Sequence, residues 1–236
     1  MMRNSLICMA CVALLGVPLS SQEPQRVRLP DPQYKGKVSL EEALMQRRSV
    51  RSYASGQVSL NDLSQILWAA QGVTEKIERA PSSWRGSKWY GGLRTAPSAG
   101  ALYPLEVYAL AGNVGGLQTG TYRYDPTGHS LLRIATEDKR PALFEAALRQ
   151  QSIKEGAAVL VVTGVVARTA VKYGDRAQRY VYMEAGSVAQ NIYLESESLG
   201  LGTVLIGAFR DAGVKEALNL PGDEDPLIIM PLGKKQ

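Results

Sequence analysis

The hydrophobic positions in the first third of the chain recur at the spacing of α-helices. Ser39 and Glu42 have the spacing of a capping box, the pair of side chains that often begins a helix. Ser59 and Asp62 repeat this spacing, and Gly72 follows where a helix would end. We therefore predict two helices, one after Ser39 and one from Ser59 to Gly72. Their apolar faces are formed by Leu40, Ala43 and Leu44 and by Leu60, Leu63, Ile66 and Leu67.

Strand patterns dominate the middle of the chain. Residues 120–124 and 131–134 flank an Asp-Pro-Thr-Gly turn, which predicts a hairpin. Residues 157–166 form a continuous apolar, β-branched run that indicates a buried central strand. Helices and strands without a strict βαβ rhythm favour one α+β domain over residues 39–236. We also predict strands at 106–111, 203–206 and 227–232 and helices at 140–150, 176–198 and 212–218.

Two further segments have the composition of irregular structure. Residues 22–38 are polar and carry several prolines, which predicts a linker. Residues 73–92 carry glycine, serine, proline and scattered charges, and we interpret them as a loop or lid. Its large side chains, Trp84, Trp89 and Tyr90, either cover a substrate or anchor the loop to the body.

The first residues have the pattern of a secretory signal peptide. Arg3 precedes an apolar run over residues 5–19, and Pro18, Ser20 and Ser21 then break the pattern. The run is short for a membrane span. We therefore predict a signal peptide over residues 1–21, export to the periplasm, and no stable membrane insertion after cleavage. The alternative is an uncleaved segment that anchors the protein in a membrane.

Composition narrows the chemistry by elimination. Hydrophobic residues are 45% and charged residues 21%, a normal globular balance, and the net charge of +5 is spread along the chain. It therefore gives no support to nucleic-acid binding. Both cysteines, Cys8 and Cys11, lie in the predicted signal peptide. A mature chain would therefore contain no cysteine and one histidine, His129. We expect no metal site and no cysteine nucleophile, and we interpret His129 as a solvated turn residue. An enzyme of this composition needs a cofactor.

Three segments could bind a ligand. Arg47-Arg48-Ser49-Val50-Arg51 offers guanidinium forks that match phosphate oxygens, although it could also be a solvated helix end. Residues 94–104 form a loop rich in small residues, whose backbone can approach a flat ligand or can simply lead into a strand. Lys234 and Lys235 could close on an anion or form a solvated tail.

The glycines at 200, 202 and 207 do not indicate a dinucleotide fold. That fingerprint requires a strand before the glycines and a helix after them, whereas the predicted order here is the reverse. A Rossmann site is therefore not expected.

The order and spacing of these segments resemble the nitroreductase family, and within it the SagB/ThcOx-type dehydrogenases. The similarity runs from about Ser39 to Lys235. It rests on the arginine segment, Pro97-Ser98-Ala99-Gly100 before Tyr103-Pro104-Leu105-Glu106, Gly120-Thr121-Tyr122-Arg123-Tyr124-Asp125-Pro126, Lys172-Tyr173-Gly174, Glu184-Ala185-Gly186, Gln190-Asn191 and Gly200-Leu201-Gly202.

The resemblance implies a nitroreductase-like α+β fold with a central mixed sheet flanked by helices, and FMN bound at a homodimer interface. It implies that Arg47, Arg48, Ser49 and Arg51, together with Lys234 or Lys235, hold the flavin phosphate. Pro97, Ser98, Ala99 and Gly100 match a loop that passes along the isoalloxazine ring from the partner subunit. Leu205, Ile206 and Gly207 match a strand end whose backbone amide approaches flavin N5, and Gln190 matches a nearby helix position.

The resemblance also suggests candidate catalytic residues. Lys172 and Tyr173 are similar to the acid/base pair of azoline dehydrogenases, although the pair could equally be structural with the lysine at the surface. Ser187 stands where that branch would have histidine, so the role of the histidine does not carry over.

Three functions follow as expectations. The first is NAD(P)H-dependent reduction of nitro or quinone compounds by hydride transfer through the flavin. The second is oxidation of a peptide or heterocycle of the azoline type. The third is an exported flavin-binding protein without turnover. Because NAD(P)H is scarce outside the cytoplasm, an exported enzyme would need another electron donor.

Overall fold

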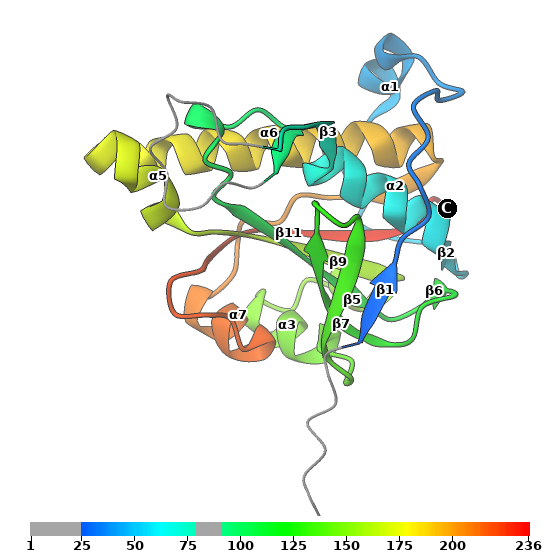
Figure 1. The fold of residues 1–236 in the computed structure, drawn as a ribbon. Coiled ribbons are helices and arrows are strands. Elements are labelled where there is room, and N and C mark those ends of the chain that lie inside the picture. Colours follow the sequence, from blue (N-terminus) through cyan, green and yellow to red (C-terminus); the bar gives the residue numbers. More distant parts are fainter. Residues whose placement is uncertain (1–24, 79–90) are drawn as a thin grey trace, which may run out of the picture.

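A seven-stranded sheet forms the centre of the computed structural model, which describes residues 25–78 and 91–236 (Figure 1). Its strand order is β1-β8-β7-β5-β9-β11-β10, and each neighbouring pair is antiparallel. In chain order the strands are β1 (Arg26–Arg28), β5 (Leu105–Ala111), β7 (Gly120–Asp125), β8 (Ser130–Ala135), β9 (Ala158–Gly164), β10 (Leu201–Thr203) and β11 (Asp225–Lys234).

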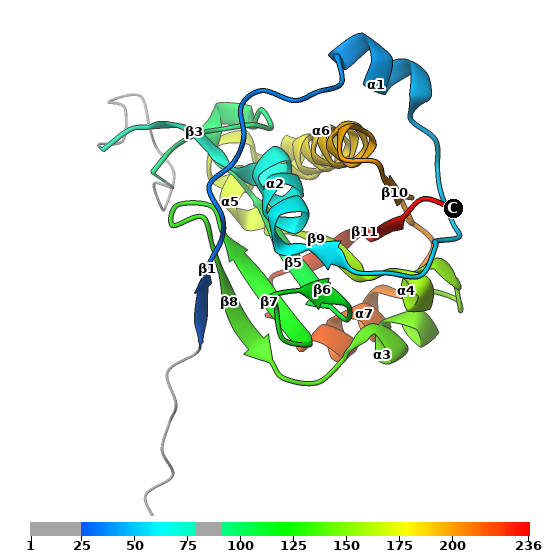
Figure 2. The same cartoon turned by 90° about the vertical axis from the view of Figure 1, so that its right-hand side faces the viewer.

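Helices cover both faces of this sheet (Figures 1 and 2). One face carries α2 (Leu60–Gln71), α5 (Val166–Tyr173) and the long α6 (Ala177–Ser198). The opposite face carries α3 (Arg140–Ala146), α4 (Ser152–Glu155) and α7 (Asp211–Leu218). Helix α1 (Leu40–Gln46) projects from the body beyond the sheet (Figure 2). Within the described part of the chain, no helix combines the length and apolar character needed to cross a bilayer.

Alternation along the central strands builds a separate hydrophobic core on each face. Val107 and Ala109 of β5 join the core under α2 and α6, whereas Tyr108 and Leu110 join the core over α3 and α7. All seven residues of β9 are buried, because helices cover both faces. The predicted buried central strand is therefore confirmed.

The prediction of a mixed central sheet is wrong for the seven strands themselves. In the described residues, parallel pairing occurs between β2 (Val58–Ser59) and β6 (Val114–Gly115), outside that sheet, and at the single bridge between Ser49 and Thr203. The apolar run in β9 is typical of parallel interiors, but burial on both faces produces the same pattern in an antiparallel sheet.

The two predicted helix starts are confirmed. The Ser39 hydroxyl accepts the amide of Glu42, and the Ser59 hydroxyl accepts the amide of Asp62. The predicted apolar face of the first helix is different, because Ala43 is buried while Leu40 and Leu44 are 60% and 50% exposed. Within one chain, therefore, α1 keeps apolar side chains in water.

Two segments that the sequence predicts as irregular contain strands. Arg26–Arg28, inside the expected linker, form β1 and pair with β8. Val73–Lys76, inside the expected lid, form β3 and pair with β4 (Gly92–Arg94). Both are short and mostly polar, so backbone pairing rather than apolar alternation defines them. Trp84, Trp89 and Tyr90 and the predicted signal peptide lie outside the described residues.

Other boundaries shift for local reasons. The apolar run predicted as one strand to residue 166 ends at Gly164, and α5 begins at Val166 without a capping side chain. The helix predicted over 140–150 ends at Ala146, because Leu148 and Arg149 take left-handed backbone angles before α4.

His129 joins three parts of the fold and is not a solvated side chain. Its Nε2 lies 2.8 Å from the Ser64 hydroxyl of α2 and 2.9 Å from the Pro30 carbonyl. Its Nδ1 lies 2.9 Å from the Tyr124 hydroxyl of β7. The turn prediction was right, but only the fold brings Pro30 and Ser64 to the imidazole. Burial lowers the pKa of His129 below its ordinary value.

This arrangement predicts a stability that declines in mild acid. Because the folded pKa is below the unfolded value of about 6.5, the unfolded chain takes up the proton first as pH falls. Stability from neutral His129 is thus present above about pH 6.5 and lost below it. At pH 7.5, His129→Gln should cost about 1–3 kcal/mol through lost hydrogen bonds. Urea unfolding should show this difference shrinking towards pH 5.5, and a constant difference would contradict the interpretation.

Candidate flavin site

The segment Arg47–Tyr53 is anchored on two glycines of the sheet. Gly202 of β10 and Gly233 of β11 face each other in the ladder. A Cβ on Gly202 would lie 2.7 Å from Val50 Cγ1, and one on Gly233 would lie 2.5 Å from Tyr53 Cγ. The Tyr53 hydroxyl also donates to the carbonyls of Val50 and Pro231. Val50 and Tyr53 thus occupy the space that side chains on these glycines would need.

This anchoring presents a group of cations, which we call the cationic segment: Arg47, Arg48, Arg51 and Lys234. Arg47 lies over the Tyr193 ring, 5.0 Å from its centroid, and Arg51 is exposed. Lys234 lies beside Gly56, and its carbonyl accepts the Ala54 amide. Among the described residues, no carboxylate forms a salt bridge with these four side chains.

Two predicted phosphate ligands have other partners. Arg48 donates to the carbonyls of Met45 and Arg47, so it caps the C-terminal end of α1. Lys235 forms an ion pair with Glu197, a carboxylate that is 9% exposed. The positive charge of Lys235 is therefore already balanced, and Lys234 is the better placed of the two lysines.

Tyr193 connects the cationic segment to the end of β10. Its hydroxyl lies 3.0 Å from Ser49 Oγ and accepts the Leu205 amide at 2.8 Å. The Ile206 amide donates to Ile229, so the amides of Leu205 and Ile206 are both occupied. Gly207 is exposed, and within the described structure its amide has no acceptor. Of the three residues expected near flavin N5, Gly207 keeps an amide available. Tyr193 follows Gln190-Asn191 in the stretch that carries the family resemblance, but the sequence assigned it no role.

Gln190 lies one helical turn before Tyr193 on α6 and is exposed. The residues predicted to contact the flavin phosphate and ring from one chain thus lie near the C-terminal half of α6.

The loop over residues 97–104 forms the second part of the predicted site. Gly100, Ala101 and Tyr103 have φ angles of 64°, 52° and 45°. For alanine and tyrosine these angles are strained, so surrounding bonds must hold them. Ser98 Oγ accepts the Tyr103 amide at 2.9 Å, Arg168 donates to the Tyr103 carbonyl, and the Tyr103 hydroxyl accepts the Arg94 amide.

Glu184 of α6 binds the backbone of the same loop. It is 6% exposed, and its Oε1 accepts the Ala99 amide at 2.9 Å. Burial raises the pKa of Glu184 to about 7, although the Ala99 amide, the Ser98 hydroxyl and Arg94 all act in the opposite direction. Glu184 belongs to the Glu184-Ala185-Gly186 motif of the family resemblance, but that motif assigned it no role. Its spacing from Val181 and Val188 also places it on one face of the helix, the face that the fold buries.

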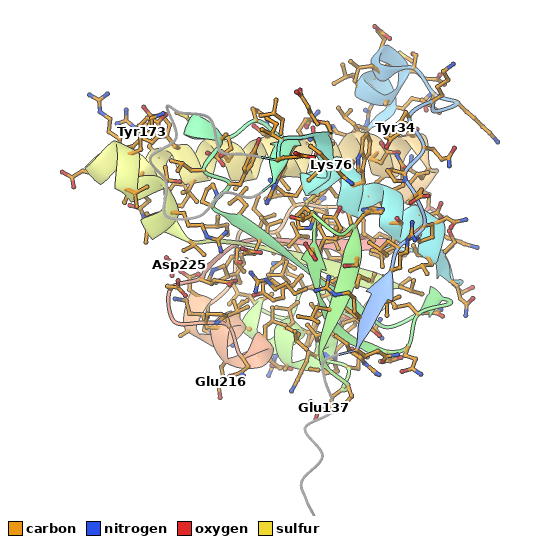
Figure 3. All side chains as sticks on the ribbon, viewed as in Figure 1. Tyr34, Lys76, Glu137, Tyr173, Glu216 and Asp225 are labelled. Carbon is orange, nitrogen blue, oxygen red and sulfur yellow. The ribbon has the colours of Figure 1, made fainter. Side chains whose placement is uncertain are left out.

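Lys172 and Tyr173 lie against this loop. A Cβ on Gly100 would stand 3.1 Å from both Lys172 Nζ and the Tyr173 hydroxyl. Lys172 is exposed, whereas Tyr173 is half-buried and packs edge-on against Tyr180. Figure 3 labels Tyr173, the last residue of α5. The fold thus brings the predicted catalytic pair and the predicted ring loop together. Whether the pair is catalytic remains a prediction.

The two halves of the site are separated within one chain. Glu184 and Tyr193 are nine residues apart on α6, which is about 13 Å along the axis and half a turn around it. The loop and the cationic segment therefore lie on opposite sides of this helix. No group of three or more His, Cys, Asp or Glu side chains suited to a metal occurs in the described residues.

Comparison with known proteins decides the family. Residues 44–234 match the model of the Nitroreductase family. The chain belongs to the nitroreductase family. Nitroreductases are flavin oxidoreductases that typically bind FMN, so the protein is an oxidoreductase enzyme.

Three relatives show how far the similarity extends. A Methanocaldococcus jannaschii protein named as a nitroreductase is 44% identical over 213 residues, 90% of this chain and 98% of that protein. The Microcin B17-processing protein McbC of Escherichia coli is 32% identical over 133 residues, 54% of this chain and 48% of McbC. A crystal structure named as a nitroreductase, from Ralstonia eutropha, is 27% identical with a TM-score of 0.71, covering 95% of this chain and 96% of that one.

The residues present fit FMN. Its phosphate dianion requires several charge-assisted donors at a partly buried place. The cationic segment offers arginine and lysine side chains that pair with no carboxylate in the described part of the chain. Its ring needs a close backbone approach, which the exposed Gly207 and the Cβ-free Gly100 allow.

Proposed function

We propose that this protein is an FMN-dependent reductase that takes hydride from NADPH or NADH and passes it to small nitro or quinone compounds. The observation that carries the proposal is the cationic segment, which is anchored on Gly202 and Gly233 and forms no salt bridge with a carboxylate of the described residues. When bound, FMN would supply the hydride chemistry. Arg47, Ser49, Arg51 and Lys234 would hold its phosphate, and the Gly207 amide would face its ring.

A second candidate reaction is oxidation of a peptide or heterocycle of the azoline type. The observation that favours it is the position of Lys172 and Tyr173 beside Gly100, where an amine and a phenol could move protons to or from a substrate. The similarity to McbC agrees with this alternative.

Anaerobic addition of NADPH to the flavin-loaded protein separates these reactions. The reductase proposal expects rapid bleaching of the flavin absorbance, followed by recovery when a quinone is added. A flavin that NADPH or NADH does not bleach, but an azoline-containing peptide does, would favour the second reaction. A loaded flavin that no donor reduces would indicate the third possibility, a flavin-binding protein without turnover.

We further propose that two copies of the chain form the site. The separation of the loop from the cationic segment supports this, because a partner could bring its own loop to the flavin. The exposed apolar side chains of α1 and α6 also support it, among them Met45 at 68% and Met183 at 60%. Sedimentation at micromolar concentration should give the mass of two chains; a single-chain mass with full FMN binding would refute the shared site.

Export to the periplasm is a separate proposal, carried by the pattern of residues 1–21. An exported form would need a hydride donor other than NADPH or NADH, so export and the reductase proposal are tested independently. Mass spectrometry of protein recovered from the periplasm should show loss of the segment near Ser20 or Ser21. Recovery of the intact chain from the membrane would instead support the anchored alternative, and an intact chain in the cytoplasm would refute export.

A further inference from the structure

We propose that Glu184 is a positioning residue whose carboxylate holds residues 98–103 against Lys172 and Tyr173, and that uptake of a proton by this carboxylate loosens the loop. Only the expected effect of Glu184 on the reaction rate rests on the proposed function. The contacts of Glu184 with the loop stand independently of it.

The geometry makes Glu184 the support of a strained turn. Its Oε1 accepts the Ala99 amide directly, and the Ser98 hydroxyl also bonds to the carboxylate. Ser98 Oγ in turn accepts the Tyr103 amide, so one carboxylate orders both ends of the turn. Non-glycine residues in left-handed conformations persist only where neighbouring bonds hold them. Ala101 and Tyr103 meet that condition here.

On the side away from Glu184, the turn lies against the predicted catalytic pair, Lys172 and Tyr173. Lys172 Nζ and the Tyr173 hydroxyl both lie 3.1 Å from the position of a Gly100 Cβ. A shift of the turn by a fraction of an ångström would therefore change the position of both groups relative to a substrate. Such small shifts can alter rates strongly, because catalysis requires closely aligned groups.

The surroundings of Glu184 favour gain and loss of a proton near neutral pH. Arg94, which ends β4, and Tyr103, from the loop, are the ionisable groups that act on it electrostatically. Lys172 and Tyr173 face Gly100 on the far side of the loop. A carboxylate accepts both the Ala99 amide and the Ser98 hydroxyl, whereas the protonated acid is a weaker acceptor. The loop should therefore be tighter at pH 8 than at pH 6.

The test compares wild type, Glu184→Gln and Glu184→Ala, with Glu195→Gln as the matched control. Glu195 lies on the same helix, and burial also raises its pKa, but its hydrogen-bond partner is Gln65 of α2 rather than the loop. Hydrogen exchange over residues 98–103 is measured on the full chain without flavin at pH 6 and pH 8, corrected for the intrinsic pH dependence of exchange. A second measurement follows the pH profile of kcat/KM for NADPH-dependent quinone reduction.

We expect wild type and Glu195→Gln to gain protection between pH 6 and pH 8, while Glu184→Gln shows no change with pH. Glu184→Ala should lose about tenfold protection at pH 8, where the lost hydrogen bond is to a charged group, and less at pH 6. Wild-type kcat/KM should bend near pH 7, and Glu184→Gln should remove this bend.

Failure of this inference can be told apart from failure of the proposed function. Wild-type protection that is the same at pH 6 and pH 8, or Glu184→Gln protection that still varies with pH, would overturn the role of Glu184. A wild-type protein with the expected exchange but no turnover would support Glu184 as the loop's support and refute the reductase proposal instead. A bend near pH 7 that persists in Glu184→Gln would overturn its role in the reaction.

Discussion

Replacing Arg47 and Arg51 together by alanine should weaken FMN binding by at least about 100-fold. Each arginine would contribute charge-assisted hydrogen bonds to the phosphate, worth about 1.5–3 kcal/mol apiece. Neither side chain pairs with a carboxylate in the described structure, so their removal leaves no buried acid behind. The folded state should therefore change little, and the loss should appear in affinity, measured by flavin fluorescence.

A charge-matched control is available at the surface. Arg28 and Arg149 lie at exposed salt bridges away from the cationic segment, with side chains 84% and 75% exposed. Replacing both by alanine removes the same two positive charges and should change FMN affinity by less than about threefold, because surface charges act weakly at a distance. Equal loss in the two double variants would mean that net charge, and not the predicted contacts, governs binding.

Gly233→Ala should destabilise the protein by about 1–3 kcal/mol and also weaken FMN binding. The added methyl group would stand 2.5 Å from Tyr53 Cγ, so either the ring or strand β11 must move. The Tyr53 ring anchors the cationic segment, and its displacement would shift Arg51 and Ser49 together. Urea unfolding and flavin titration of the same sample measure the two effects.

Gly222→Ala is the matched control for this substitution. Nothing lies within 4 Å of a Cβ on Gly222, which stands in the connection before β11. Its stability and FMN affinity should equal those of wild type. If Gly233→Ala binds FMN as tightly as Gly222→Ala, the packing of Tyr53 on Gly233 does not position the phosphate ligands.

The sequence predicted the elements whose formation depends on residues close together in the chain. The capping serines at 39 and 59 predicted helix starts, because a hydroxyl that accepts an amide three residues later acts within one turn. The long α6 and the buried β9 were evident from periodicity and length. Segment β1 could not be predicted, since its polar residues form a strand only when β8 offers a free edge.

The candidate site divides in the same way. The sequence and its family resemblance identified the arginines and the loop, but not what holds them. Gly202 and Gly233 are far apart in sequence, and only the β10–β11 ladder makes them one platform for Val50 and Tyr53. Glu184 likewise gained a role only when the fold placed Ala99 and Ser98 over α6. The contacts of His129 could not be predicted for the same reason, because its partners Pro30 and Ser64 are remote from it in sequence.

FMN binding by the cationic segment is tested most directly by titrating FMN into the purified chain that lacks the predicted signal peptide, residues 22–236, followed by flavin fluorescence and absorbance. We expect saturation at one FMN per chain, with affinity that falls as salt is raised because the phosphate contacts are ionic. A colourless protein that takes up no added FMN would contradict it.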